Sequence, residues 1–219
     1  SGAPPSTHPR VLVAESQTAG RGRQGRTWQS APGRSLTFSV GLPLLPQHGW
    51  GALSLVVGHA VAQALQPWPQ LPTEGHDGRL LLKWPNDLWW YDRFPSTPAE
   101  RAAGRKVGGI LIETTAQPNS PADGGGRRWV VIGVGLNIEP VLYDGEPLNA
   151  ALPAPRASVS EWWHGITAPV LWHRVVPGLL EAVRTFEAQG FGPFADAVHR
   201  REVLIGQPVS LSSGSVREG

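Results

Sequence analysis

Residues 105–114 read Arg-Lys-Val-Gly-Gly-Ile-Leu-Ile-Glu-Thr, and residues 129–138 read Trp-Val-Val-Ile-Gly-Val-Gly-Leu-Asn-Ile. Both are short apolar runs rich in β-branched residues, which is typical of buried strands. The segment between them contains Pro118, Pro121 and three consecutive glycines at 124–126, so it predicts a long hairpin connection. Each run also contains two glycines, which weaken a strand unless a ligand or another backbone must approach closely. The two runs therefore predict a sheet with a ligand lying against it.

Further strands and helices are predicted on both sides of this hairpin. Apolar runs predict strands over 11–14 and 80–84, and the alternation of residues 35–40 predicts a half-buried strand. The helical period predicts helices over 50–66 and 194–202. A helical stripe from Leu171 to Phe186 runs through Pro177, so we expect a kink or two abutting helices there. Residues 209–211 predict a strand that the chain end cuts short, as expected for a truncated small β domain.

Length and composition exclude several classes of protein. The chain has 219 residues, a formal net charge of +2 and no cysteine. A chain of this length buries roughly 70% of the surface that its unfolded form exposes, so it needs neither disulfides nor a structural metal. No apolar stretch approaches the ~20 residues that cross a bilayer, and no secretory leader opens the sequence. We expect a soluble, cytoplasmic protein with one globular domain, or one domain and a small appendage.

The charged residues are unevenly distributed. Of the 19 lysines and arginines, only Lys83 and Lys106 are lysines. No acidic residue lies between Glu15 and Glu74, and that window contains Arg21, Arg23, Arg26 and Arg34. The window predicts a local positive field suited to a phosphate-bearing partner, and a solvated basic loop is the alternative.

Two polar motifs accompany the apolar runs. Residues 20–25 read Gly-Arg-Gly-Arg-Gln-Gly after a predicted strand, but Pro32 and Gly33 prevent the helix that a dinucleotide-binding motif needs. We interpret this segment as a glycine-hinged arginine loop that folds over an anion. Residues 83–87 read Lys-Trp-Pro-Asn-Asp between two apolar runs. An Asx turn is the structural alternative for this second motif.

These segments, in this order, resemble the catalytic domain of biotin protein ligase over roughly residues 11–138. Residues 17–28 resemble the family's biotin and adenylate loop, and residues 83–87 resemble its second signature. The resemblance implies an α/β (α+β) fold of the class II synthetase type, with a mixed β-sheet backed by helices. It also implies a catalytic domain over 1–203 and the start of a truncated SH3-like domain over 204–219.

The same resemblance implies a two-step reaction. Biotin and MgATP would give biotinyl-5'-AMP, and a lysine of a biotin carboxyl carrier protein would then accept the biotinyl group. ATP and Mg²⁺ are the expected cofactors. No helix-turn-helix pattern precedes the arginine loop, which argues against a DNA-binding domain, and a homodimer is left open.

Site residues follow from the resemblance. The catalytic residues would be Lys106, Arg23 and Asp87, with the compact ammonium of Lys106 between carboxylate and phosphate. Biotin would contact Gln17, Gly20, Arg21, Arg23, Lys106, Gly108 and Gly109. ATP and the adenylate would contact Arg21, Arg23, Arg26, Trp28, Asn86, Asp87 and Asn137. Asp87 would also bind Mg²⁺ or deprotonate the incoming amine.

Three features depart from the family pattern. The family's Ser-Thr-Asn segment, which helps to hold biotin, has no counterpart here, because residues 6–8 lie too close to Gln17. Residues 94–104 resemble an insertion before Lys106, and the C-terminal β domain is cut short. We further expect the loop over residues 17–34 to be disordered without ligand and to order over it, because its glycines and like charges disfavour collapse.

Two other functions remain open at this stage. A lipoate ligase would perform the same adenylation on a different acid, although the arginine loop beside Lys-Trp-Pro-Asn-Asp favours biotin. A non-enzymatic arginine-glycine nucleic-acid binder would also explain the acid-free window. Such a protein would normally interleave aromatic and basic residues, and Trp28 is the only aromatic residue close to the cluster.

Overall fold

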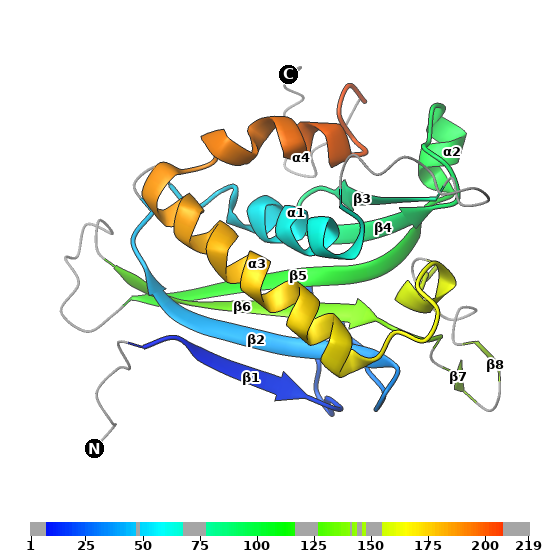
Figure 1. The fold of residues 1–219 in the computed structure, drawn as a ribbon, viewed down its shortest axis with the longest axis horizontal. Helices are drawn as coiled ribbons and strands as arrows, with labels where there is room; N and C mark the ends of the chain where they lie inside the picture. The colour runs from blue at the N-terminus through cyan, green and yellow to red at the C-terminus, as the bar shows by residue number, and fades with distance from the viewer. Residues whose placement is uncertain are drawn as a thin grey trace.

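A six-stranded sheet in the order β1-β2-β6-β5-β4-β3 organises the chain (Figure 1). The computed structural model describes residues 8–46, 49–67, 78–116, 127–140, 142–143, 146–147 and 155–207. The strands are β1 Arg10–Ala14, β2 Ser35–Leu44, β3 Arg79–Lys83, β4 Asp87–Tyr91, β5 Arg105–Ala116 and β6 Arg128–Asn137. A separate two-stranded sheet, β7 Leu142–Tyr143 and β8 Glu146–Pro147, was not predicted.

The helix-backed architecture expected from the sequence is confirmed, but the strands of the sheet do not run in mixed directions. All five pairings between neighbouring strands are antiparallel. Within the described ranges, parallel pairing occurs only as two isolated bridges, Leu82 with Glu202 and Lys106 with Arg156. The β5–β6 pairing confirms the predicted hairpin, whose connecting residues 117–126 lie outside the described residues.

Two helices, α1 Leu53–Leu65 and α3 Ala168–Gln189, cover one face of the sheet (Figure 1). Their buried leucines and valines pack on alternate residues of β2, β5 and β6 to form the main core. Phe38 and Trp172 join sheet to helix, with ring centroids 5.1 Å apart. α3 continues through Pro177, so the expectation of two abutting helices is wrong. Proline removes one backbone hydrogen bond, whereas Val176 and Leu179 on either side of it are buried and hold both halves on the core.

Shorter helices occupy the connections. They are α2 Pro98–Ala102, α4 Ala195–Arg201 and the 3₁₀ turns η1 Arg23–Gly25, η3 Val159–Glu161 and η4 Gly192–Phe194. α2 lies within the insertion predicted at 94–104 and begins with a capping box between Thr97 and Glu100. No described helix combines the length and the apolarity needed to cross a bilayer.

The described chain ends beside β3. The Val203 amide donates to the Leu82 carbonyl at 2.9 Å, so the segment after α4 packs against the edge of the sheet. The strand predicted over 209–211 lies outside the described residues, and the division into domains at 203/204 stays a prediction.

Candidate active site

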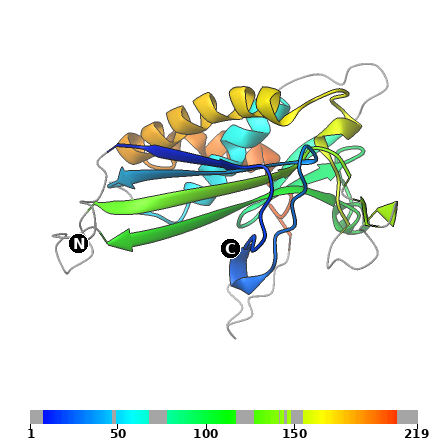
Figure 2. The same cartoon turned by 90° about the horizontal axis from the view of Figure 1, so that it is seen from below.

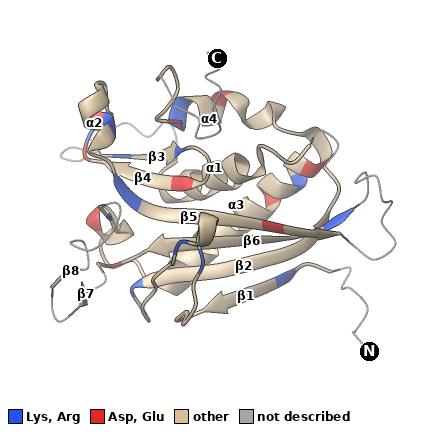
Figure 3. Cartoon of the chain, turned by 180° about the vertical axis from the view of Figure 1, so that it is seen from behind, with Lys and Arg blue, Asp and Glu red and all other residues tan. Residues whose placement is uncertain are grey.

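The face of the sheet opposite α1 and α3 carries the predicted site residues. We call it the open face. Figure 2 shows the helices on one side of the sheet and the loop that contains η1 on the other. In Figure 3, which views the molecule from behind, that loop lies in front of β5 and β6.

One row of residues crosses the open face through all six strands. Residues that lie directly opposite one another in antiparallel strands share a face. The registers align Ala14, Thr37, Gly135, Gly109, Asp87 and Lys83 from β1 to β3. The centre of this row has small or absent side chains, and its β4–β3 end carries an acid and a lysine. The row is therefore charged at its β4–β3 end, which suits a charged group of a ligand, whereas Thr37 and Gly135 in its other half are buried.

A β-bulge places Lys106 beside this charged end. Ile110 belongs to the helix-covered core, and strict alternation would put Lys106 on the same face. Leu88 pairs with Gly108, but the next residue, Trp89, pairs with Lys106, so β5 contains one extra residue. The bulge turns Lys106 to the open face, where its Nζ lies 2.7 Å from Asp87 Oδ1. The two side chains are 28% and 23% exposed, so the pair is half-buried and still open to a ligand.

Hydrogen bonds fix the backbone of Lys106 on both sides. Its amide donates to the Pro155 carbonyl at 2.8 Å, and its carbonyl accepts from the Ala157 amide at 3.0 Å. The buried Asn137 donates from Nδ2 to the carbonyls of Lys106 and Ala157, both at 3.1 Å. The predicted contact of Asn137 with the adenylate stays a prediction. Its Nδ2 holds the backbone that carries Lys106, whereas its buried Oδ1 has no hydrogen-bond partner in the described structure.

Asn86 fixes Asp87 in a similar way. Its side-chain amide donates to the Ile110 carbonyl at 2.7 Å, and its own carbonyl accepts from the Ile110 amide at 2.9 Å. The Ser54 hydroxyl, from α1, donates to the Pro85 carbonyl at 2.7 Å. The turn between β3 and β4 is therefore held by the backbone of β5 and by α1, and Asp87 follows it at a fixed place.

The arginine loop forms a small hairpin. The Gly22 amide donates to the Arg26 carbonyl at 2.7 Å, and the Trp28 amide donates to the Gly20 carbonyl at 2.9 Å. The chain reverses at Gln24 and Gly25, whose φ angles of 57° and 72° lie in the left-handed region. The hairpin exposes the side chains of Arg21, Arg23 and Arg26, and none of them joins an ion pair among the described residues.

Trp28 joins the loop to the row. A Cβ atom on Gly135 would lie 2.5 Å from the Trp28 ring, so only glycine lets the indole rest on β6. The Trp28 Nε1 is buried and has no hydrogen-bond partner in the described structure. A Cβ on Gly20 would lie 2.4 Å from the Trp28 carbonyl and 3.0 Å from the Gln17 side-chain oxygen. Gln17, Gly20 and Trp28 are therefore brought together at the base of the loop.

The two glycines of β5 have different roles. A Cβ on Gly109 would lie 3.4 Å from both Asp87 Oδ1 and Lys106 Nζ, so Gly109 leaves space at the ion pair. A Cβ on Gly108 would lie 2.6 Å from the Leu136 side chain and the Gly135 carbonyl. The missing side chain of Gly108 therefore permits close packing on the helix side, and the predicted contact of Gly108 with biotin stays a prediction.

Arg156 was not predicted, and it links the loop to Lys106. Its backbone forms the bridge with Lys106, and its Nη2 donates to the Gln29 side chain at 3.2 Å. Burial lowers the pKa of Arg156. The residue stands among prolines and alanines, in a segment with no recognisable pattern, so sequence reasoning had nothing with which to find it.

The residues around Asp87 do not fit a resident Mg²⁺ site. No group of three or more histidine, aspartate or glutamate side chains able to hold a metal occurs in the described ranges. One oxygen of Asp87 already accepts from Lys106. A metal held here would therefore need most of its ligands from elsewhere, because Mg²⁺ prefers six oxygen ligands.

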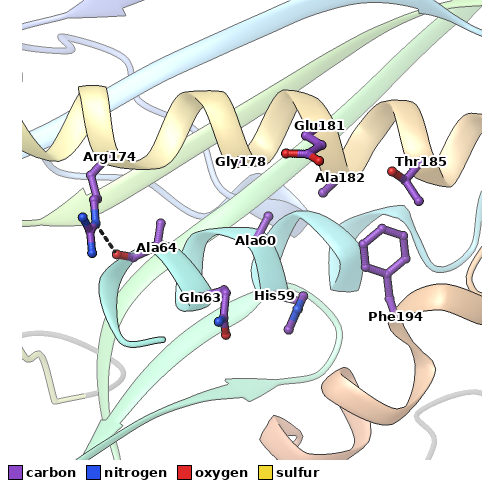
Figure 4. Close-up of a pocket in the computed structure, with 10 residues that line it drawn as sticks. All are labelled: His59, Ala60, Gln63, Ala64, Arg174, Gly178, Glu181, Ala182, Thr185 and Phe194. Carbon is purple, nitrogen blue, oxygen red and sulfur yellow. Dashed lines mark hydrogen bonds between the residues drawn. The ribbon is translucent and has the colours of Figure 1, made fainter. Parts of the chain in front are cut away.

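The helix side carries a separate groove of about 410 Å³ between α1 and α3 (Figure 4). His59, Arg174, Glu181 and Phe194 are among its lining residues, and Arg174 Nε donates to the Ala64 carbonyl at 3.2 Å. None of the residues predicted for the site lines this groove, which lies across the sheet from Lys106 and Asp87.

Comparison with known proteins gives the family. A sequence model of the Biotin/lipoate A/B protein ligase family matches residues 4–137, the part that contains the loop, the row and Lys106. The chain belongs to this ligase family.

Individual relatives agree with the family. A biotin--[acetyl-CoA-carboxylase] ligase of Mycobacterium tuberculosis is 37% identical over 77% of this chain and 57% of its own length. A protein of the same name from Paracoccus denitrificans is 30% identical over 93% of this chain and 75% of its own length. The solved biotin protein ligase of Aquifex aeolicus, in complex with biotin and ATP, superposes with a TM-score of 0.60 and 25% identity, covering 88% of this chain and 68% of that one. The ligase-family chain thus spans little more than half of the Mycobacterium relative.

Proposed function

We propose that this ligase-family domain makes biotinyl-5'-AMP from biotin and ATP and then transfers the biotinyl group to a lysine of a biotin carboxyl carrier protein. The observation that carries the proposal is the Lys106–Asp87 pair at the charged end of a glycine-floored row, with an arginine hairpin on the same face. The ligands named for the Aquifex relative, biotin and ATP, have the matching chemistry. The carboxylate of the acid would lie toward Lys106, with its largely uncharged remainder between Gly109 and the Trp28 indole.

Adenylation brings two anions together. The carboxylate oxygen attacks the α-phosphorus of ATP, a phosphorus–oxygen bond forms, and pyrophosphate leaves with the electron pair of the broken bond. Lys106 would stand between the carboxylate and the α-phosphate and stabilise the charge that develops there. Its fixed backbone means that little reorganisation is needed, because only the flexible stem of the side chain moves.

The arginines of the hairpin would supply further positive charge in addition to that of Lys106. Arg21, Arg23 and Arg26 would close over the phosphates, since a guanidinium fork matches two phosphate oxygens at once. Their exposure leaves them available to a ligand. Trp28 Nε1 is a further donor near the row, and Gln17 would bind the ureido group of biotin.

Transfer of the acyl group needs a free amine. The nitrogen of the carrier lysine attacks the acyl carbon, AMP leaves, and one proton must be removed from the nitrogen. Asp87 would accept that proton once Lys106 is engaged with the adenylate. Mg²⁺ would arrive bound to the phosphate oxygens of ATP and neutralise their charge, with Asp87 supplying at most one ligand.

Biotin-dependent exchange of labelled pyrophosphate into ATP tests the proposal. We expect exchange with biotin and much weaker exchange with lipoate, tested on the same preparation so that folding is controlled. Exchange with lipoate alone would replace biotin by lipoate as the substrate. Exchange with neither acid, together with RNA binding that weakens steeply with salt, would favour the nucleic-acid binder.

A further inference from the structure

Lys83 is the second of the two lysines, and the reaction outlined above does not use it. It ends β3 and lies directly opposite Asp87 of β4. Its Nζ lies 3.5 Å from the centre of the Trp89 ring. A cation over the face of an indole is attracted by the ring quadrupole, so this position is a favourable resting place for the ammonium.

Charged groups on three elements surround Lys83. Burial lowers the pKa of Lys83, and Lys106 lowers it further, whereas Asp87 and Glu202 raise it. Glu202 follows α4, and burial raises its pKa. Two lysines therefore flank the carboxylate of Asp87, one from β3 and one from β5.

The two lysines stand in different relations to Asp87. Among the described residues, the one ion pair of Asp87 is with Lys106. Once the ammonium of Lys106 turns to a carboxylate and a phosphate, the carboxylate of Asp87 would be left half-buried without a partner, which is costly. Lys83 occupies the cross-strand position opposite Asp87, and lysine's flexible stem can carry its ammonium there.

We propose that Lys83 is the reserve cation of Asp87: it rests on Trp89 while Lys106 holds the carboxylate, and it moves onto the carboxylate when Lys106 engages the ligand. This inference rests on the proposed function for its second state, because the ligand is what draws Lys106 away. Lys83 is thus a positioning residue that keeps the Asp87 carboxylate paired and oriented between the two half-reactions. The competing explanation is that Lys83 merely covers the small apolar cluster of Leu81, Trp89, Tyr91 and Val203.

The two-lysine composition gives a direct test. Selective ¹³C-labelling of lysine yields only two side-chain spin systems, assigned with Lys83→Arg and Lys106→Arg. In the free wild-type protein, the Lys83 methylene protons beside the indole should be displaced upfield by the ring current. In Lys106→Met, Asp87 has lost its partner, so this upfield displacement should disappear as Lys83 leaves the ring. In the double variant Lys106→Met/Asp87→Asn, Lys83 should stay on the ring, because the carboxylate that attracts it is gone.

A second experiment adds a non-hydrolysable sulfamoyl analogue of biotinyl-adenylate to the full wild-type chain. Bound analogue should shift the Lys83 protons in the same direction as Lys106→Met does. Transfer of the biotinyl group from preformed adenylate to a carrier protein should slow about fivefold in Lys83→Met, the size of one partly exposed ion pair, and recover in Lys83→Arg. A residue that only covers apolar surface would not move in these spectra.

The outcomes separate the two proposals. A Lys83 signal that is unchanged in Lys106→Met overturns the reserve-cation inference, whether or not the chain makes an adenylate. Lack of pyrophosphate exchange by the wild type overturns the proposed function, while the comparison of Lys106→Met with Lys106→Met/Asp87→Asn still decides where Lys83 goes.

Discussion

The two faces of the sheet are built from alternate residues of the same strands, yet they obey different rules. Leu136 belongs to the core on the helix side, and its exposure is 0%. Its neighbour Gly135 faces the other way and has no side chain, so that Trp28 can rest there. On the helix face, large apolar side chains pack closely and stabilise the fold. On the open face, the missing side chains of the glycines leave space for a ligand beside the few groups that carry charge.

This difference indicates that the helix face provides most of the stability and the open face provides the chemistry. Substitutions on the helix face should change the free energy of unfolding and leave the chemistry alone. Substitutions on the open face should change the chemistry, and they should also lower stability where they displace a packed side chain such as Trp28. Five experiments test this division, taken from the largest expected effect to the smallest.

Loss of the Lys106 ammonium should have the greatest effect on activity. We expect Lys106→Ala to reduce pyrophosphate exchange by about 10²–10³-fold, the usual cost of removing one preorganised stabilising group. The melting temperature should stay close to that of wild type, because the ion pair is partly exposed. Arg184→Ala, at an exposed position on α3, serves as the control with normal exchange. Normal exchange by Lys106→Ala would remove Lys106 from the mechanism.

On the helix face, Leu136→Ala should destabilise the fold by about 3 kcal/mol, because it leaves a cavity in the core. Urea unfolding measures this change. The exchange rate per folded molecule should remain within about twofold of wild type, a difference of only ~0.4 kcal/mol. A large drop in that rate at unchanged stability would show that the two faces are not independent.

The pH dependence of stability should also come from the helix side. Burial, aided by Arg201 and Arg200, lowers the pKa of His59 from 6.5 to about 4. Between these values the unfolded chain binds a proton that the folded chain does not, so the free energy of unfolding falls as the pH decreases from 6.5 to 4. We expect a loss of about 2 kcal/mol that His59→Gln abolishes, which is less than the full shift implies because solvent screens the partly exposed ring. His173→Gln, at an exposed position, should keep the full pH dependence.

Two glycines of β6 form a matched pair on the open face. A Cβ on Gly135 would strike the Trp28 ring, whereas one on Gly133 would meet the Leu111 carbonyl at 3.4 Å. Gly135→Ala should displace the indole, cost about 2 kcal/mol of stability and weaken biotin binding, as measured by denaturation and calorimetry. Gly133→Ala should be nearly neutral. Equal effects of the two substitutions would mean that Trp28 does not depend on the space over Gly135.

The smallest effect concerns the arginine hairpin. Biotin and ATP at ten times their Kd should slow tryptic cleavage after Arg21, Arg23 and Arg26 by about tenfold, if the liganded hairpin resists the protease. Equal cleavage of the hairpin with and without ligands would contradict the expectation that it orders over the adenylate.

Much of this arrangement was predictable from particular residues. The apolar runs at 105–114 and 129–138 predicted the hairpin of β5 and β6, and the scarcity of lysine drew attention to Lys83 and Lys106. Alternation also identified the polar side of β2, but it predicted exposure, and Ser35 and Thr37 are only 3% exposed. Neighbouring segments cover them: the Thr37 hydroxyl donates to the Ala14 carbonyl at 2.9 Å, and the Ala31 amide donates to the Ser35 hydroxyl at 3.3 Å. The segment that covers a given strand is decided by tertiary structure, so the burial of Ser35 and Thr37 could not be predicted from local alternation.

The sequence by itself determined the two motifs, the family resemblance and most of the long strands and helices, because these depend on local period and residue type. It did not identify β4, α2 or the small sheet of β7 and β8. Tertiary structure alone decided that Lys106 meets Asp87. Strict alternation sends Lys106 to the core, and only the extra residue of β5, fixed by its pairing with β4, turns it to the open face. The roles of Asn137 and Arg156 were decided in the same way, by backbone segments far apart in the chain. A register between strands is set by the packing of whole faces, so no local pattern could have disclosed it.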